Sequence, residues 1–416
     1  MKKEVLEKEK MNFKEEFKIV GFFYILSAIF WISIGIMGAY WILYFAEMGL
    51  TYSLIALIFI MVPIASLIFE IPTGAIADIF GRKVSVFISY LFTGLAYIGI
   101  ILSGTNVFLL MILYFILGIA YTFESGALES WFVDTIKHEK KQKYMHRFFG
   151  RWGSISSIGF VIGPFIGGLL VKKGIATAFW TTAIIMLFLS FFVLVFCKEP
   201  YFKRKKVMLN KDLKETIVTA KIGFKHIFSQ KIILVLTLIT VLLTFANQMS
   251  YNAYQPFVVK RGLPIEYLGF ALSIAGFISI FSLNYSHKIA KYLGGNRKSL
   301  LVFTFLFGLA ILGVAFFKYL PILFISLIGY TAFAEFTGLS GTSAPAFKEL
   351  YNKFVPSKIR ATVISSTSFF MKIGEILGLL SFGLISSYIG LQAGIIFAGC
   401  IIILISFIYL KIRVRR

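Results

Sequence analysis

The chain has 416 residues, of which 58% are hydrophobic, 17% aromatic and only 15% charged. This composition is too apolar for a soluble protein of this length, and it places the chain in a lipid bilayer. The net charge of +23 does not indicate nucleic-acid binding, because the cations gather in alternate connections between apolar runs rather than on one polar face.

Residues 1–18 contain six lysines and five glutamates and lack the apolar core of a signal peptide. We therefore expect a cytoplasmic N-terminal segment here, followed by a first apolar run that stays in the membrane. The apolar runs long enough to cross the hydrocarbon core predict twelve helices, at 19–44, 53–77, 84–103, 106–132, 150–171, 176–197, 231–258, 266–285, 299–317, 321–346, 360–386 and 392–411.

The connections between these spans are unequally charged. The side that holds both termini carries 36 Lys or Arg, and the other side carries 5. Because cytoplasmic connections are enriched in Lys and Arg, both termini are predicted to be cytoplasmic, in a protein of the cell membrane.

The connection between the second and third spans combines glycines with charges. Gly74, Asp78, Gly81, Arg82 and Lys83 stand at spacings that predict a tight, charged hairpin between two membrane helices. These residues resemble the loop signature of the major facilitator superfamily, with Ile79 where the family usually has a cation.

The resemblance implies that Asp78 meets the N-terminus of the eleventh helix near Arg360, and that Arg82 pairs with Asp134, so that together they close the cytoplasmic side. The alternative is an ordinary solvated hairpin.

The fifth span carries a run of small residues. Gly150, Gly159, Gly163, Pro164, Gly167 and Gly168 match the antiporter motif of the drug exporters of this superfamily. Glycines at these spacings let another helix approach closely, which limits leakage while the halves move. The alternative is generic packing. The helix 4 arginine of those exporters is missing, and Tyr114 stands in its place.

Ionisable residues inside apolar runs are candidates for proton coupling, because a charge facing lipid costs about 3 kcal/mol or more. We expect them to line a wet cavity, to pair or to bind protons. Structural alternatives are a permanently protonated carboxyl at Glu124 or Glu335, an anchor at Glu70, and a self-neutralising pair at Lys372 and Glu375. The candidates are Glu70, Glu124, Glu335, Lys372 and Glu375.

Polar and aromatic residues in the first and seventh spans are candidates for a substrate cavity, although some of them fit an interfacial aromatic belt or interhelical hydrogen bonds equally well. The set is Tyr40, Trp41, Tyr44, Asn247, Gln248, Tyr251, Asn252 and Gln255.

Residues 198–230 separate the chain into two sets of six spans. Their basic start, at 203–206, is expected to lie against anionic lipid, and the periodic apolar residues after Asn210 predict an amphipathic helix on the membrane surface, with a disordered linker as the alternative. The domain prediction is a cytoplasmic segment at 1–18, bundles at 19–197 and 231–411, this linker between them, and a cytoplasmic tail at 412–416.

The sequence therefore predicts an all-α membrane protein with twelve transmembrane helices in two pseudo-symmetric six-helix bundles. The expected function is secondary active transport, namely proton-coupled efflux of an amphipathic or drug-like small molecule. The alternatives are a nutrient importer on the same fold and a non-transporting receptor or scaffold. We expect no enzymatic activity, cofactor, metal or nucleic-acid partner, since no nucleotide-binding loop or metal-ligand cluster is found.

Overall fold

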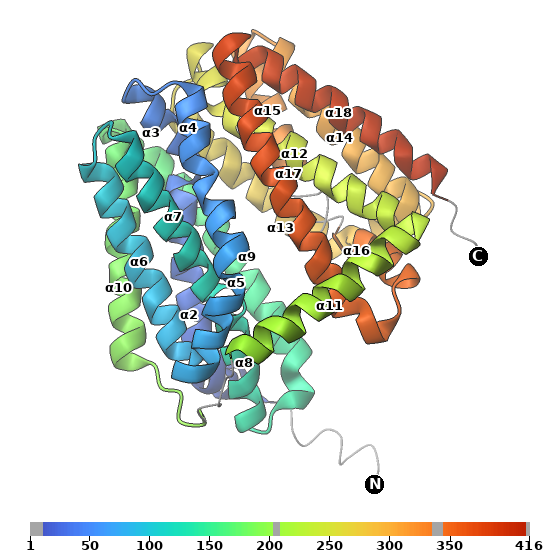
Figure 1. Ribbon diagram of the computed structural model, residues 1–416. Coiled ribbons are helices and arrows are strands. Elements are labelled where there is room, and N and C mark those ends of the chain that lie inside the picture. The colour runs from blue at the N-terminus through green and yellow to red at the C-terminus, as the bar shows by residue number, and fades with distance from the viewer. Residues whose placement is uncertain (1–10, 203–208, 335–343, 413–416) are drawn as a thin grey trace.

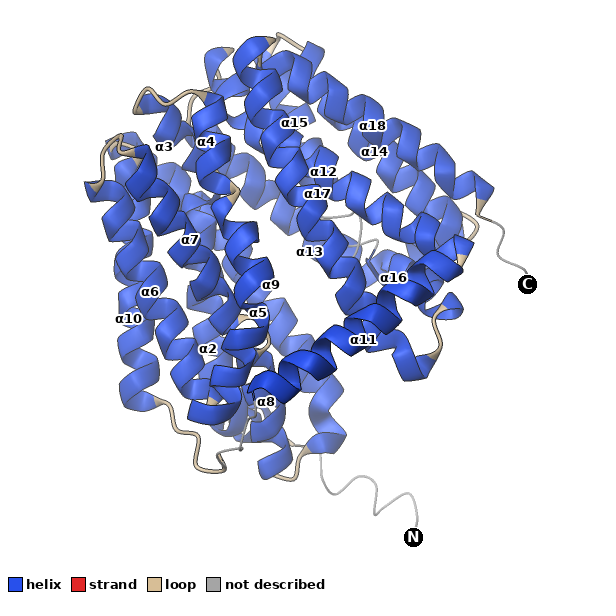
Figure 2. Cartoon of the chain, viewed as in Figure 1, coloured by secondary structure: helices blue, strands red, loops and turns tan. Residues whose placement is uncertain are grey.

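The computed structural model describes residues 11–202, 209–334 and 344–412, and the regular structure in these ranges is helical. The helices form two bundles that meet at one end and diverge toward the other (Figure 1). Helix α11 (Leu209–Ser229) crosses between the bundles at the divergent end, and mostly short loops connect the remaining helices (Figure 2). Helix α2 (Phe13–Gly38), the first described helix, begins at the same divergent end.

The first bundle contains six spans, three of which are built from two consecutive helices. In chain order its helices are α2 (Phe13–Gly38), α3 (Trp41–Glu47), α4 (Tyr52–Phe59), α5 (Met61–Phe80), α6 (Arg82–Leu102), α7 (Val107–Glu124), α8 (Ala127–His138), α9 (Met145–Leu170) and α10 (Ala176–Phe196).

The second bundle follows α11 and adds a short helix, α16, before its last two spans. Its helices are α12 (Lys231–Lys260), α13 (Glu266–Tyr292), α14 (Asn296–Phe316), α15 (Leu320–Ala334), α16 (Ala344–Phe354), α17 (Arg360–Tyr388) and α18 (Leu391–Lys411).

Ten helices in the described ranges are long and apolar enough to cross a membrane. They correspond to ten of the twelve predicted spans. The predicted span 266–285 is met by α13, which bends by 77° between Phe281 and Tyr285. The predicted span 321–346 begins as α15, but part of it, 335–343, lies outside the described residues.

Three spans predicted as continuous helices are broken instead. The first breaks after Gly38, and the fourth breaks at Ser125 and Gly126, where Gly126 has a φ of 72°. The second breaks at Ile60, because Pro63 has no N–H to donate to the carbonyl of Phe59. Hydropathy finds such spans but not their breaks, since both halves of a broken span are equally apolar.

The closest packing inside the first bundle is between α2 and α9. Gly159, Gly163 and Gly167 recur at every fourth residue and face the backbone of α2, so that a methyl group at Gly159 would lie 2.7 Å from the carbonyl oxygen of Ala28. Methyl groups at Gly163 and Gly167 would meet the carbonyl oxygens of Ile32 and Ile36. The glycines therefore allow backbone-to-backbone contact.

The other small residues of this run are placed differently. Gly168 faces α13 of the second bundle, where a methyl group would lie 2.9 Å from the carbonyl oxygen of Glu266, and Pro164 packs against Gly269 and Gly35. Gly150 has open space beside it. The predicted single seam is thus two seams, one within the first bundle and one between the bundles.

A buried carboxylate joins the same two helices near the divergent end. Glu16 is fully buried, accepts a hydrogen bond from the Tyr24 hydroxyl at 2.8 Å, and forms ion pairs with Arg147 (Nε at 3.1 Å) and Arg151. Two guanidinium groups satisfy the charge of Glu16, whose desolvation would otherwise be costly. The α2–α9 pair is therefore fixed at this end by charge and along its length by glycine contacts.

Replacing Gly163 by alanine should lower stability, because the added methyl group cannot fit against the backbone of α2. Overpacking of this kind costs about 1–3 kcal/mol. Gly150→Ala is the matched control, since the same substitution in the same helix meets open space. Thermal unfolding in detergent should show a lower midpoint for Gly163→Ala and no loss for Gly150→Ala. Equal midpoints for the two variants would contradict the assignment of this seam.

Candidate functional site

A cavity of about 420 Å³ lies between the two bundles. Residues from both halves line it, from α2 to α9 on one side and from α12 and α17 on the other. The lining residues are Met37, Trp41, Phe59, Val62, Tyr97, Tyr114, Leu117, Tyr121, Phe160, Asn247, Gln248, Tyr251, Asn252, Lys372, Glu375 and Leu379.

The wall from the first bundle is apolar and aromatic. The Phe59 ring is stacked on that of Tyr114, with centroids 4.9 Å apart, and packs edge-on against Trp41 at 6.0 Å. The hydroxyls of Tyr97 and Tyr121 are 2.9 Å apart and hydrogen-bonded. This wall offers flat surfaces and hydroxyl groups but no charge.

The wall from the second bundle is polar. Asn247, Gln248 and Asn252 on α12 supply amide groups, and the Lys372 ammonium on α17 lies 2.9 Å from the Glu375 carboxylate. Lys372 and Glu375 keep 36% and 19% of their side-chain surfaces exposed, so water reaches the pair. All charged residues that line the cavity therefore belong to one ion pair.

Two buried polar atoms on the residues lining the cavity have no hydrogen-bond partner among the described residues. They are the indole nitrogen of Trp41, which is a donor, and the side-chain oxygen of Asn247, which is an acceptor. A buried polar atom without a partner is unfavourable.

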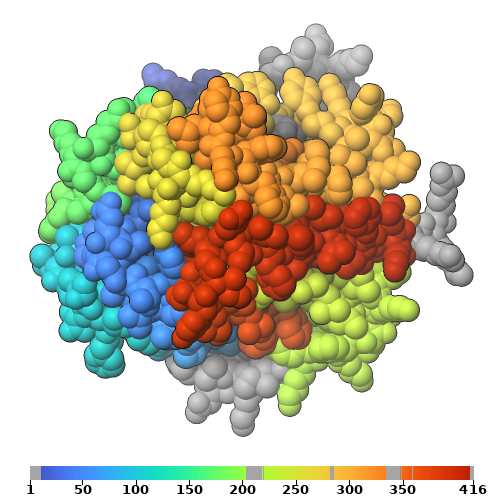
Figure 3. Space-filling view, turned by 90° about the horizontal axis from the view of Figure 1, so that it is seen from above, coloured from blue at the N-terminus to red at the C-terminus, as the bar shows by residue number. Residues whose placement is uncertain are grey.

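At the end opposite α11 the two bundles are joined to each other. The carbonyl of Gly38 accepts hydrogen bonds from the Tyr251 hydroxyl at 3.0 Å and from the Gln255 amide at 3.4 Å. The Ser53 hydroxyl donates to the carbonyl of Gly383 at 3.1 Å. In the view from this end, blue atoms of the first bundle abut red and yellow atoms of the second (Figure 3).

Three of the predicted cavity residues do not line the cavity. Gln255 is buried in the junction with Gly38, the hydroxyl of Tyr40 lies against Gly269, and the Tyr44 ring stacks on Phe179 at 4.2 Å. The structure places the other five in the wall, namely Trp41, Asn247, Gln248, Tyr251 and Asn252.

The predicted proton-coupling residues are spread over several places. Lys372 and Glu375 line the cavity, whereas Glu124 is the last residue of α7, at the break before α8. Glu70 is exposed on α5, and Glu335 lies outside the described residues.

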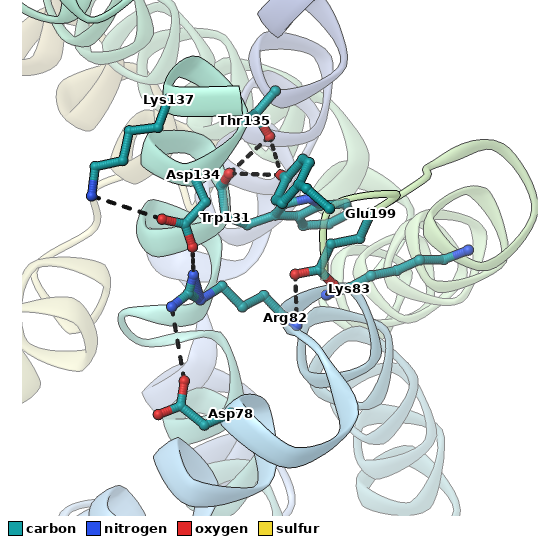
Figure 4. Close-up of polar contacts among 9 residues, drawn as sticks. Asp78, Arg82, Lys83, Trp131, Asp134, Thr135, Lys137 and Glu199 are labelled. Carbon is teal, nitrogen blue, oxygen red and sulfur yellow. Dashed lines mark hydrogen bonds and ion pairs between the residues drawn. The ribbon is translucent and has the colours of Figure 1, made fainter. Parts of the chain in front are cut away.

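The charged hairpin between α5 and α6 forms a compact cluster. The Arg82 guanidinium bridges Asp78, 3.8 Å away, and Asp134 on α8, which also pairs with Lys137 at 3.9 Å (Figure 4). The predicted contact between Arg82 and Asp134 is therefore present. The proximity of Asp78 to the N-terminus of α17 remains a prediction.

Glu199, just after α10, completes this cluster and was not foreseen from the sequence. Its carboxylate accepts hydrogen bonds from the backbone amides of Arg82 at 3.3 Å and Lys83 at 3.0 Å, at the N-terminus of α6, where negative charge is favourable. Burial raises the pKa of the Glu199 carboxyl, and these amide bonds oppose the shift. The ammonium of Lys83 donates to the Leu194 carbonyl at 2.8 Å.

Tyr201 joins the same cluster to α8. Its hydroxyl donates to the carbonyl of Trp131 at 3.3 Å and is hydrogen-bonded to the Thr135 hydroxyl. Burial raises the pKa of Tyr201 to about 12, so the hydroxyl stays protonated and able to donate. The only sequence signal for Glu199 and Tyr201 was an acidic and an aromatic residue at the start of a basic connection.

Two bundles of apolar helices around a shared cavity, joined at one end, are the architecture of a membrane transporter that opens to each side in turn. The model of the Major Facilitator Superfamily matches residues 20–378. The chain belongs to this superfamily and is a secondary transporter.

Similar proteins agree with this assignment. The chain is 26% identical over 377 residues to the uncharacterized MFS-type transporter YxaM of Bacillus subtilis, covering 90% of this chain and 91% of that protein. It is 24% identical over 394 residues to the uncharacterized MFS-type transporter MJ1560 of Methanocaldococcus jannaschii, covering 92% and 95%.

Solved structures share the fold at low sequence identity. A variant of the nucleoside transporter NupG has a TM-score of 0.74 at 14% identity, over 94% of this chain and 98% of that one. A D-xylose–proton symporter has a TM-score of 0.69 at 14% identity, over 94% and 97%. These likenesses concern the fold alone.

Gly81→Ala should destabilise the hairpin cluster. Gly81 has a φ of 99°, and a methyl group there would lie 2.8 Å from the Glu199 carboxylate. A non-glycine residue in this backbone region costs about 1–3 kcal/mol. Gly74→Ala is the control, because it meets open space within the same signature and alanine favours a helix by about 1 kcal/mol. Thermal unfolding should show a lower midpoint for Gly81→Ala than for Gly74→Ala. A Gly81→Ala midpoint equal to that of the unsubstituted protein would contradict the close packing of Gly81 against the Glu199 carboxylate.

Proposed function

We propose that the protein is a proton-coupled exporter of an amphipathic or drug-like small molecule, working by alternating access in the cell membrane. The observation that carries this proposal is the cavity of about 420 Å³ between the bundles. Its volume is in the range of sites that hold drug-sized ligands. One wall is aromatic and the other is polar, which suits a molecule with two chemically different faces.

The orientation of the protein follows from its charges. The side with both termini has far more Lys and Arg than the other side, and on the positive-inside rule that side is cytoplasmic. The bundles are joined at the opposite end through Gly38, Ser53 and their partners. The cavity then faces the cytoplasm, which is the state in which an exporter takes up its substrate.

Coupling to protons requires a carboxylate whose protonation changes its contacts. Among the acidic residues in the described ranges, Glu375 lines the cavity. Protonation of its carboxylate would break the ion pair and release the Lys372 ammonium. Glu124, at the break between α7 and α8, and Glu335 are further candidates from the sequence. Glu70 is a weaker one, because its exposed position on α5 is separate from the cavity wall.

Proton coupling can be tested in proteoliposomes with a pH-sensitive dye inside. A panel of amphipathic compounds that differ in charge is added from outside, and proton movement is recorded. At least one compound should cause proton movement opposite to its own flux. Glu375→Gln should remove the proton signal, while Glu129→Gln, an exposed carboxylate on α8, should keep it. Compound flux without proton movement would contradict the coupling.

The double variant Glu124→Gln plus Glu335→Gln tests the two remaining carboxylates in the same assay. Coupled flux should fall in this variant if either residue carries the proton, and unchanged flux would reject both. The direction of accumulation in intact cells separates export from import: the proposal predicts lower accumulation in cells that contain the protein, whereas an importer would raise it.

A further inference from the structure

The charges of the cavity are arranged in a way that selects among ligands. The wall from the first bundle contributes no ionisable acid or base other than tyrosine, and the wall from the second contributes one ammonium and one carboxylate, Lys372 and Glu375, 2.9 Å apart. The cavity is therefore neutral overall but has two opposite charges close together on one face of α17.

A ligand with a single charge disturbs this balance. An anion that binds Lys372 leaves the carboxylate of Glu375 without its partner, and a cation that binds Glu375 leaves the ammonium of Lys372 without one. An unpaired charge in a partly desolvated site is costly. A ligand with both charges a few ångströms apart can separate the pair and still leave every charge with a partner.

The ion pair is free to be separated in this way. Lys372 and Glu375 are three residues apart on the same helix, and within the described part of the chain each is the sole ionic partner of the other. The pair is also partly accessible, with 36% of the Lys372 side-chain surface and 19% of that of Glu375 exposed. A ligand can therefore reach both groups from the cavity.

The remainder of the wall defines the rest of the ligand. Trp41, Phe59 and Tyr114 form an aromatic surface in the wall from the first bundle, with neighbouring ring centroids 4.9 and 6.0 Å apart. The indole N–H of Trp41 and the side-chain oxygen of Asn247 are buried, and neither has a hydrogen-bond partner within the described ranges. A cavity of about 420 Å³ has room for a compact ring system attached to a polar head, but not for a long chain.

We propose that the cavity binds a compact amphipathic zwitterion, with a carboxylate on Lys372, an ammonium on Glu375 and an aromatic or bulky apolar body against the wall of the first bundle. This substrate class rests on the proposed transport function for its biological meaning, but its binding is measurable without transport. Such a ligand exchanges one internal ion pair for two ion pairs with the protein and leaves no charge alone.

A matched ligand series tests the proposal. The probe is 4-phenyl-L-phenylalanine, compared with its N-acetyl derivative (anion), its methyl ester (cation) and the N-acetyl methyl ester (neutral), by calorimetric titration of the purified full chain. The zwitterion should bind at least about tenfold more tightly than each of the other three. The proposal is overturned if any derivative binds as tightly as the zwitterion, or if none of the four binds.

Two double variants control for the ion pair. The swap Lys372→Glu plus Glu375→Lys should retain the zwitterion preference, because both charges remain. The neutral variant Lys372→Met plus Glu375→Gln should bind all four compounds within about threefold of one another. Thermal unfolding identifies any variant that fails to fold. In that case the ligand series on the unsubstituted protein still tests the zwitterion preference without the variant. A neutral variant that keeps the preference would contradict the assignment.

The two proposals fail in different ways. Preferential binding of the zwitterion without coupled flux would contradict the exporter function and leave the ligand class standing. Coupled flux of another compound, with no preference for the zwitterion in the titrations, would do the reverse.

Discussion

A charge within a membrane-spanning segment must avoid hydrocarbon, and this constraint determines how the molecule is built. Exposing Lys372 or Glu375 to lipid would cost about 3 kcal/mol or more each. The structure places them together, 2.9 Å apart, in the wall of a cavity shared by both bundles. The cavity accommodates the charges, and it also creates a region where a polar molecule can enter the membrane interior.

Close backbone contact is the second requirement. Within the first bundle, Gly159, Gly163 and Gly167 bring α9 onto α2, so the bundle can move as one body. Between the bundles, Gly168 lies against α13 and Gly383 lies against α4. The contacts between the bundles lie at one end and consist of packing and a few hydrogen bonds. Such a junction can separate and form again.

The parts of this arrangement that depend on local sequence were predictable. Hydropathy found the spans because a hydrocarbon layer demands a certain length of apolar helix. The pairing of Lys372 with Glu375 follows from their spacing of three residues on one helix. The hairpin signature led to the contact between Arg82 and Asp134.

The parts that depend on distant residues were not predictable. Glu199 accepts a hydrogen bond from the amide of Lys83, 116 residues away in the sequence. Neither segment contains a pattern that predicts this contact. Phe59, Tyr97 and Tyr121 line the cavity, but the segments around them have the composition of any apolar membrane helix. Tyr40 and Tyr44 looked equivalent to Trp41, yet the break after Gly38 turns only Trp41 toward the cavity wall.

Alternating access requires the two bundles to move against each other around the cavity. Distances between pairs of spin labels measure this movement. One pair is placed at the joined end, at Thr105 and Lys318, and the other at the divergent end, at Lys141 and Lys353. The two native cysteines, Cys197 and Cys400, are first replaced by serine. The distances are compared at about pH 8 and at about pH 5, because lowering the pH supplies the protons that the proposed coupling uses. The two distances should change in opposite directions between these two pH values. Distances that stay fixed, or that lengthen and shorten together, would contradict this movement.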